Sequence, residues 1–182
     1  MKIIRRLLSQ LRGEQDLEKL IKRGFVVGKD FKRMGGVIID PSHCWHIKIG
    51  DNVTLAPRVH ILAHDASTGL FLGYTRVSNV TIGSNVFIGA GSIVLPGVSI
   101  GNNVVIGAGS VVSRDIPDCS VAVGNPARTI KTIDDYLNRE KDRMKDNNLF
   151  GEEYTLRNPR FGVTERNKMI KAVEEDGRLY VK

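Results

Sequence analysis

The sequence predicts an all-β solenoid, a parallel β-helix with α-helices at its N- and C-terminal ends, on three observations. Between residues 82 and 112 an aliphatic residue returns at every sixth position. A second small or branched residue lies four places after each of the first five, so each six-residue unit offers two inward-facing side chains. Glycine follows the aliphatic residue in most units, where we expect it to turn the backbone with positive φ. A fixed six-residue period is typical of coiled β-solenoids.

Three series of residues carry this period. The first is Ile82, Ile88, Val94, Ile100, Ile106 and Val112; the second is Val86, Ser92, Val98, Val104 and Ser110; the glycines are Gly83, Gly89, Gly101 and Gly107. A β-sandwich would instead show strands spaced by about 8 to 12 residues and joined by hairpin turns. The sequence has neither feature.

Residues 1–24 predict an amphipathic helical segment in which basic residues surround an apolar stripe. Residues 1–39 carry 10 basic and 4 acidic groups, which accounts for most of the net charge of +7. Two placements stay open for the helix: packing on the coil or a neighbouring subunit, and weak contact with a membrane surface. No window approaches the roughly 18 apolar residues of a membrane span. No signal-peptide core is present either, so we expect a cytoplasmic protein.

Residues 25–131 predict the β-helix domain. The six-residue period starts at Ile49, after irregular entry coils. It breaks after Ile61, because the next aliphatic residue in phase is Ile82. Residues 64–79 are therefore expected to be extruded as a loop, and interruptions of solenoids are commonly functional.

Residues 132–182 predict a C-terminal helical tail. Charged and apolar residues alternate over 133–145 as in a surface helix. A last helix is expected over 164–175, with Gly177 as its stop. The chain as a whole is 41% apolar but only 6% aromatic, which indicates one principal domain with an aliphatic core.

Composition and spacing also exclude several functions. The sequence has no Walker loop, zinc-finger spacing or basic stripe with interleaved aromatic residues, so we expect no nucleic-acid binding. Cys44 and Cys119 have neither CxxC nor metal-ligand spacing and are expected to be free thiols. The basic N-terminal excess is better suited to an anionic lipid or glycan.

Segments between about residues 28 and 131 resemble the hexapeptide-repeat acyltransferases, in particular the galactoside and maltose O-acetyltransferases. The resemblance implies three flat strands per coil wound left-handed, an exception to the usual right-handed crossover. It also implies a homotrimer with active sites between subunits. The matching segments are Ile49–Asp65, Phe87–Gly91, Ile106–Ser110, Ser113–Pro117 and Gly124–Arg128.

The same resemblance implies an acetyl-coenzyme A-dependent O-acetyltransferase that transfers the acetyl group directly to a hydroxyl, with His64 as general base. Histidine suits this role because it ordinarily titrates near neutral pH. Asp65 is its neighbour, but consecutive strand residues point to opposite faces. A backbone carbonyl could orient His64 instead, and the sequence leaves the orienting residue open. Asp40 is carried over as an acceptor-binding residue. No metal is expected.

Residues for coenzyme A follow from the resemblance as well. Small side chains let the pantetheine arm lie on the backbone, an apolar wall stands beside the thioester, and cationic residues meet the phosphates. Corner packing for the two alanines and a solvated charged face for Lys131 stay open as alternatives. The expected residues are Phe87, Ala90, Ala108, Ser113, Arg114, Arg128 and Lys131, with the alanines stacked on adjacent coils.

The expected acceptor is a hydroxyl on a sugar of a surface polysaccharide or its precursor. The asparagine that helps bind acceptor sugars in these relatives has no counterpart here, and Arg33 falls near its place. This difference argues against galactoside or maltose. An amino acid, an antibiotic and an amino sugar are the alternative acceptors.

Two other functions stay open. γ-Class carbonic anhydrases use the same coil with three zinc-binding histidines. This chain has His43, His46, His60 and His64, but their spacings differ from that pattern. A coil kept only as a scaffold is the other alternative, and His64 in the matching segment counts against it.

Overall fold

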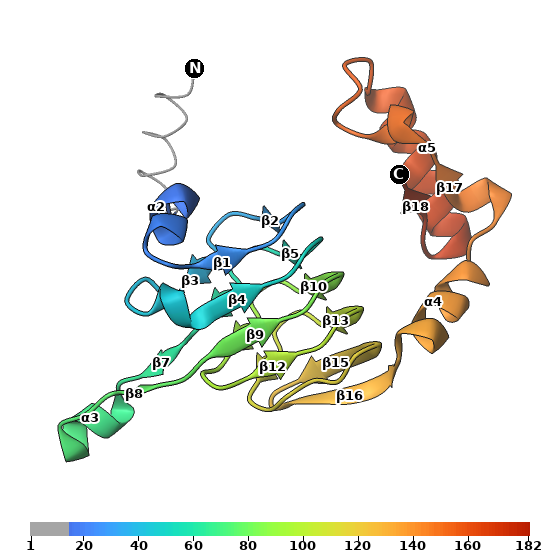
Figure 1. The fold of residues 1–182 in the computed structure, drawn as a ribbon. Coiled ribbons are helices and arrows are strands. Elements are labelled where there is room, and N and C mark those ends of the chain that lie inside the picture. Colours follow the sequence, from blue (N-terminus) through green and yellow to red (C-terminus); the bar gives the residue numbers. More distant parts are fainter. Residues whose placement is uncertain (1–14) are drawn as a thin grey trace. The chain divides into compact units, whose positions relative to one another are not determined.

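The computed structural model of the protein describes residues 15–182 and contains two compact units (Figure 1). The first unit ends at Asp134 and the second begins at Asp135. Most of the predicted N-terminal helical segment, residues 1–14, lies outside the described residues. Its remainder contains α2 (Leu17–Lys22), which is capped by the Asp16 carboxylate and buries Leu20 in the core of the first unit.

Three parallel sheets form most of the first unit, and the chain visits them in turn (Figure 1). Apart from the antiparallel pairs β7–β8 and β15–β16, consecutive strands of this unit lie in different sheets, and each coil pairs with the coil before it in register. The first sheet contains β1 (Val26–Val27), β4 (Ile47–Ile49), β9 (Val80–Ile82) and β12 (Ser99–Ile100). The second contains β2 (Lys32–Arg33), β5 (Thr54–Leu55), β10 (Val86–Ile88), β13 (Val104–Ile106), β15 (Ser120–Gly124) and the antiparallel β16 (Ala127–Thr132). The third contains β3 (Ile38–Ile39), β6 (His60–Ile61), β11 (Ile93–Val94) and β14 (Val111–Val112).

This arrangement of parallel strands in stacked coils is consistent with the β-solenoid that the six-residue period predicts. The left-handed winding stays a prediction. Both predicted inward series are buried, and no member is more than 2% exposed. The two buried serines are satisfied, since Ser92 Oγ and Ser110 Oγ both donate to the Gly107 carbonyl, at 2.9 and 2.7 Å.

Polar side chains hold one corner of the coils together. At this corner each backbone N–H donates to a side-chain oxygen of the next coil: Asp51 N to Ser84 Oγ (3.0 Å), Ser84 N to Asn102 Oδ1 (2.8 Å) and Asn102 N to Asp118 Oδ1 (2.7 Å). The corner donors that no strand pairs are thereby satisfied. The next residues are asparagines with positive φ, a conformation that asparagine tolerates well. These are Asn52, Asn85 and Asn103.

The expected role of the repeat glycines was wrong in one respect. Gly83, Gly89, Gly101 and Gly107 are absent from the positive-φ residues, which at the corners are the asparagines and glycines such as Gly91. The repeat glycines are instead needed for space. A Cβ on Gly83 would lie 2.7 Å from the Gly101 carbonyl carbon, and one on Gly89 would lie 2.4 Å from Ala108 N.

Residues 64–79 leave the coil as an arm (Figure 1). Strands β7 (His64–Asp65) and β8 (Arg76–Val77) pair antiparallel, and the short helix α3 (Ser67–Leu72) lies at the tip. Gly73 ends the helix in the left-handed conformation. The apolar side chains at the tip are exposed, with Leu70 at 81% and Phe71 at 80%.

The second unit follows the coil with its own small set of elements. Its elements are the greater part of α4 (Ile133–Lys141), the 3₁₀ turns η2 (Asp146–Asn148) and η3 (Glu152–Tyr154), α5 (Val163–Asp176), and the parallel pair β17 (Leu149–Phe150) and β18 (Tyr180–Val181). The Glu140 carboxylate accepts from Tyr180 Oη (2.9 Å) and Arg143 Nη1 (3.0 Å), which ties α4 to the last strand. Helix α5 is one residue longer at each end than expected, and Gly177 follows it in the left-handed conformation.

Membrane-spanning helices were also considered. None of the helices between residues 15 and 182 is long and apolar enough to cross a bilayer.

Replacing Gly83 by alanine is expected to lower the free energy of unfolding by about 1 to 3 kcal/mol, because the new methyl group collides with the backbone of the next coil. Urea unfolding measures the change. The matched control is Gly69→Ala in α3, where the nearest atom would be an ordinary 3.5 Å away and a helical alanine is favoured. Equal midpoints for the two variants would contradict the packing argument.

Candidate functional site

His64 lies where the chain leaves the third sheet and enters the arm. Its Nδ1 atom is 2.5 Å from Oδ2 of Asp40, which follows β3 on the preceding coil. Strands β3 and β6 pair with Ile39 beside Ile61, so the residues that follow these strands meet at the same corner. The His64 side chain is 29% exposed, whereas Asp40 is fully buried. The pair therefore combines a buried carboxylate with an accessible imidazole.

Asp40 receives hydrogen bonds from its own chain on both oxygens. Oδ1 accepts from the backbone N–H of Ser42 (3.0 Å) and of His43 (3.1 Å), and Oδ2 accepts from Ala63 N (2.9 Å) as well as from His64. Burial alone would raise the pKa of Asp40, but these hydrogen bonds outweigh it and hold the pKa below its ordinary value.

An ionised Asp40 determines the tautomer of His64. A carboxylate can only accept, so the Nδ1 atom of His64 carries the proton in this hydrogen bond. In the neutral imidazole the other ring nitrogen, Nε2, then keeps its lone pair and can accept a proton from a substrate. The hydrogen bond thus leaves an oriented imidazole with a free acceptor nitrogen.

This pairing differs from one expectation at the sequence level and fills a point that the sequence left open. Asp40, which the resemblance implied as an acceptor contact, has no exposed atom to offer an acceptor. The partner that orients His64 is the Asp40 carboxylate. Asp65, which was not expected to orient His64, instead pairs with Arg76 across the arm at 2.9 Å.

Aromatic rings extend the site beyond His64. The His43 ring centroid is 4.9 Å from that of His64 and 5.5 Å from that of Trp45. His46 Nδ1 is 2.8 Å from Oδ1 of Asn79 at the base of the arm. Sequence reasoning considered His43 and His46 only as zinc ligands and gave Trp45 no role.

The described residues contain one cluster that could ligate a metal, formed by Asp40, His43 and His64. Its ligand atoms lie within 4.8 Å of one another. His46 and His60 do not belong to it. The Asp40 oxygens already accept backbone N–H groups, so a metal would have to compete for them. The expectation of a metal-free reaction stays a prediction.

Two of the expected coenzyme A residues, Ala90 and Ala108, lie at the corner between the second and third sheets and are exposed. The Ala90 carbonyl accepts from Gly109 N at 2.8 Å, so the alanines stand on adjacent coils as expected. Phe87 is 45% exposed on β10.

Of the remaining expected coenzyme A residues, Arg128 and Lys131 lie on β16, three strands from β10 in the same sheet. Three strand spacings correspond to about 14 Å. Ser113 and Arg114 follow β14 at a different corner, between the third and first sheets. One chain therefore arranges Phe87, Arg128 and Lys131 along one sheet and leaves Ser113 and Arg114 apart from them.

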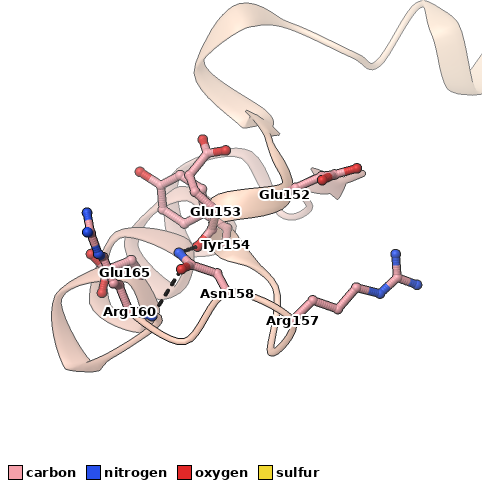
Figure 2. Close-up of a pocket in the computed structure, with 7 residues that line it drawn as sticks. All are labelled: Glu152, Glu153, Tyr154, Arg157, Asn158, Arg160 and Glu165. Carbon is pink, nitrogen blue, oxygen red and sulfur yellow. Dashed lines mark hydrogen bonds between the residues drawn. The ribbon is translucent and has the colours of Figure 1, made fainter.

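A hollow in the second unit shows no comparable chemistry. It is lined by three glutamates, two arginines, Tyr154 and Asn158 (Figure 2). Asn158 organises the loop, since its Nδ2 donates to the Glu153 carbonyl (2.8 Å) and its Oδ1 accepts from Arg160 N (3.0 Å). None of the expected site residues lies there.

Comparisons with known proteins agree with the repeat and identify the family. The family model described as bacterial transferase hexapeptide (six repeats) matches residues 79–114. Protein CapG of Staphylococcus aureus is 41% identical over 144 residues, which cover 75% of this chain and 78% of CapG. Galactoside O-acetyltransferase of Escherichia coli strain K12 is 44% identical over 95 residues, which cover 49% of this chain and 45% of that protein. The chain thus spans less than half of the latter's length.

Among solved structures, a maltose O-acetyltransferase from Clostridium difficile 630 superimposes with a TM-score of 0.54 and 35% sequence identity. The match covers 70% of this chain and 83% of that chain.

Asp40→Asn is expected to make the stability of the protein less sensitive to acid. The pKa of Asp40 is lower in the folded chain than its ordinary value of about 4, so ionised Asp40 stabilises the fold above about pH 4. That contribution is lost as the pH falls from about 4 through the folded-state pKa. Urea unfolding between pH 3 and 6 should show a shallower decline for the variant than for the wild type.

The control for this experiment is Asp30→Asn at an exposed turn, which should keep the wild-type slope. An unchanged slope in Asp40→Asn would mean that the carboxylate is not stabilised in its ionised form.

Proposed function

Since this chain belongs to the bacterial hexapeptide-repeat acyltransferases, we propose that it transfers an acetyl group from acetyl-coenzyme A to a hydroxyl of a sugar. The observation that carries the proposal is the hydrogen bond between the accessible imidazole of His64 and the buried carboxylate of Asp40. An exposed histidine that is merely part of a surface has no need of a fully buried, ionised partner.

In this proposal Nε2 of His64 accepts the proton of the acceptor hydroxyl while its oxygen attacks the thioester carbonyl. The carbon–sulfur bond then breaks, and the leaving coenzyme A thiolate takes from His64 the proton that came from the acceptor hydroxyl. Asp40 stabilises the imidazolium that forms between the two steps. Transfer is direct, and neither cysteine takes part: Cys44 is buried with its Sγ 3.7 Å from the Leu20 carbonyl, and Cys119 lies at another corner beside Asn103.

Acetyl-coenzyme A fits the exposed features of the second sheet and its edge. The pantetheine arm is long and thin, and the small side chains of Ala90 and Ala108 leave the backbone of adjacent coils open to it. Phe87 supplies an apolar surface for the thioester end. Arg128 and Lys131, about 14 Å away by strand spacing, supply positive charge for the phosphates.

The sugar acceptor is supported by what the relatives are called. The galactoside and maltose O-acetyltransferases are named for sugars. CapG matches a larger part of this chain than the galactoside enzyme does. Arg33, near the place of the missing acceptor asparagine, donates from Nη2 to the Gln15 carbonyl and so belongs to the entry coil. We therefore propose that the acceptor hydroxyl belongs to a sugar of a surface polysaccharide or its precursor. We also propose that the protein acts in the cytoplasm.

A trimer completes the site in this proposal. Within one chain, the alanines Ala90 and Ala108 precede the strands of the third sheet, whereas His64 follows a strand of that sheet, so they lie at opposite ends of its strands. On the coil of His64 the alanine corner is at Pro57, whose carbonyl accepts from Gly91 N, and His64 comes seven positions later. A neighbouring subunit can bring its alanine corner to His64, which one chain cannot do for itself.

The test of the proposed function is acetylation itself. The purified chain is incubated with acetyl-coenzyme A and a panel of nucleotide sugars, oligosaccharides, amino sugars, amino acids and antibiotics, and the products are identified by mass. Acetylated sugar hydroxyls are the expected products. Modification only of amines, or of non-sugar acceptors, would contradict the assignment.

His64→Ala is expected to lower kcat on the best acceptor by roughly 100-fold or more, because general-base assistance is worth at least that. Binding of acetyl-coenzyme A should persist. His60→Ala, which alters a histidine outside the Asp40 cluster, is the matched control and should retain wild-type turnover. Wild-type kcat in His64→Ala would remove the assignment of the base.

Replacing Leu70, Phe71 and Leu72 together by serine is expected to weaken subunit association. These side chains are 70 to 81% exposed at the tip of the arm, and a neighbouring subunit is the proposed cover. Burial of each would contribute roughly 1.5 to 3 kcal/mol, so the loss should be visible in sedimentation at micromolar concentration. An intact trimer with an unchanged acceptor KM would show the arm to be an ordinary surface excursion.

A further inference from the structure

The 3₁₀ turn η1 (Cys44–His46) places an unusual surface next to His64. Cys44 points into the core and is fully buried, whereas Trp45 is 46% exposed. The base of the Trp45 side chain packs closely on Gly24, since a Cβ on Gly24 would lie only 2.8 Å from the Trp45 Cβ. Trp45 is also the single tryptophan of the chain. The indole is thus packed at its Cβ, while much of its ring is exposed to solvent.

Trp45 and His64 flank a single intervening ring. The His43 ring lies 5.5 Å from Trp45 and 4.9 Å from His64, with interplanar angles of 52° and 44°. A second branch leads from Trp45 to His46, whose ring is 6.0 Å away and whose Nδ1 meets Asn79. The surface beside the proposed base therefore consists of an apolar indole with a polar imidazole and amide at its rim.

On this arrangement, and resting on the proposed function, we propose that Trp45 is the stacking platform of the acceptor subsite and that its ligand is a pyranose ring. The C–H face of a pyranose is apolar and its edge carries hydroxyls. An exposed indole with polar groups at its rim matches both features. A sugar stacked on Trp45 can reach His64 with a hydroxyl, because only the His43 ring lies between the two side chains.

His43 contributes a second observation at the same place. Its Nδ1 atom is buried and, within the described part of the chain, has no hydrogen-bond partner. Buried polar atoms ordinarily have one. The ring between Trp45 and His64 therefore carries a hydrogen bond that the described residues leave unmet.

The single tryptophan allows binding to be read without any reaction. Methyl β-D-glucopyranoside and N-acetylglucosamine are titrated into the full chain while the Trp45 emission is recorded, with acyclic mannitol as the control. The cyclic sugars should change the emission saturably, and mannitol should have little effect at equal concentration. No saturable change with any pyranose that the enzyme acetylates would overturn the proposal.

Kinetics on variants gives an independent reading. Relative to Trp45→Phe, which keeps an aromatic face, Trp45→Ala should raise KM for the best pyranose acceptor about tenfold and leave KM for acetyl-coenzyme A unchanged. Tyr154→Ala in the second unit is the control for a lost aromatic side chain. Equal KM values for the phenylalanine and alanine variants would contradict stacking.

Two further outcomes separate this proposal from others. If Trp45→Ala dissociates the oligomer, the indole is a subunit contact and the subsite is wrong. If the emission responds to pyranoses while no sugar is acetylated, the subsite stands and the proposed function fails. Because the fluorescence titration uses the wild-type chain, the proposal stays testable even where the alanine variant does not fold.

Discussion

The stacking of one coil on the next is the constraint on which the first unit depends. Parallel strands satisfy the backbone along the flat faces, and Ser84 Oγ, Asn102 Oδ1 and Asp118 Oδ1 accept the donors at the corner. The separation between coils is a strand spacing of about 4.8 Å, which leaves no room for a Cβ at Gly83. Side chains at the same phase of neighbouring coils are therefore forced into contact, however far apart they are in the sequence.

The site uses this constraint. Asp40 and His64 are 24 residues apart, yet the pairing of Ile39 with Ile61 puts them at one corner within hydrogen-bonding distance. The carboxylate is held by backbone donors from the turn that follows it and from Ala63, so its position does not depend on the arm. The His64 imidazole is therefore oriented by a residue of the preceding coil and not by the arm that follows it.

The six-residue period predicted what repeats and missed what does not. It identified the buried aliphatic series and the start of the arm, whereas His64 was carried over from the family resemblance. The partnership with Asp40 escaped because extra residues between β3 and β4 hide the phase of that coil. Positive φ was expected at the repeat glycines, but the structure has it at Asn85 and its equivalents. The side chains of these asparagines also hydrogen-bond to one another from coil to coil. Tyr180 and Glu140 are 40 residues apart in a segment that does not repeat, so no sequence pattern predicts their contact.

The proposed base and the proposed acceptor subsite both lie in non-repeating segments. The chain turns from the third sheet to the first at every coil, and in the coil of β11 and β12 residues 95–98 suffice. In the two preceding coils the same turn is longer: residues 40–46 supply Asp40 and Trp45, and residues 62–79 supply His64 and the arm. A four-residue turn offers few side chains for binding a ligand. The two long turns lie on adjacent coils and contact each other. Ala90 and Ala108 remain in the regular part of the coil. Changes in the long turns can therefore alter the acceptor while leaving the proposed coenzyme A surface as it is.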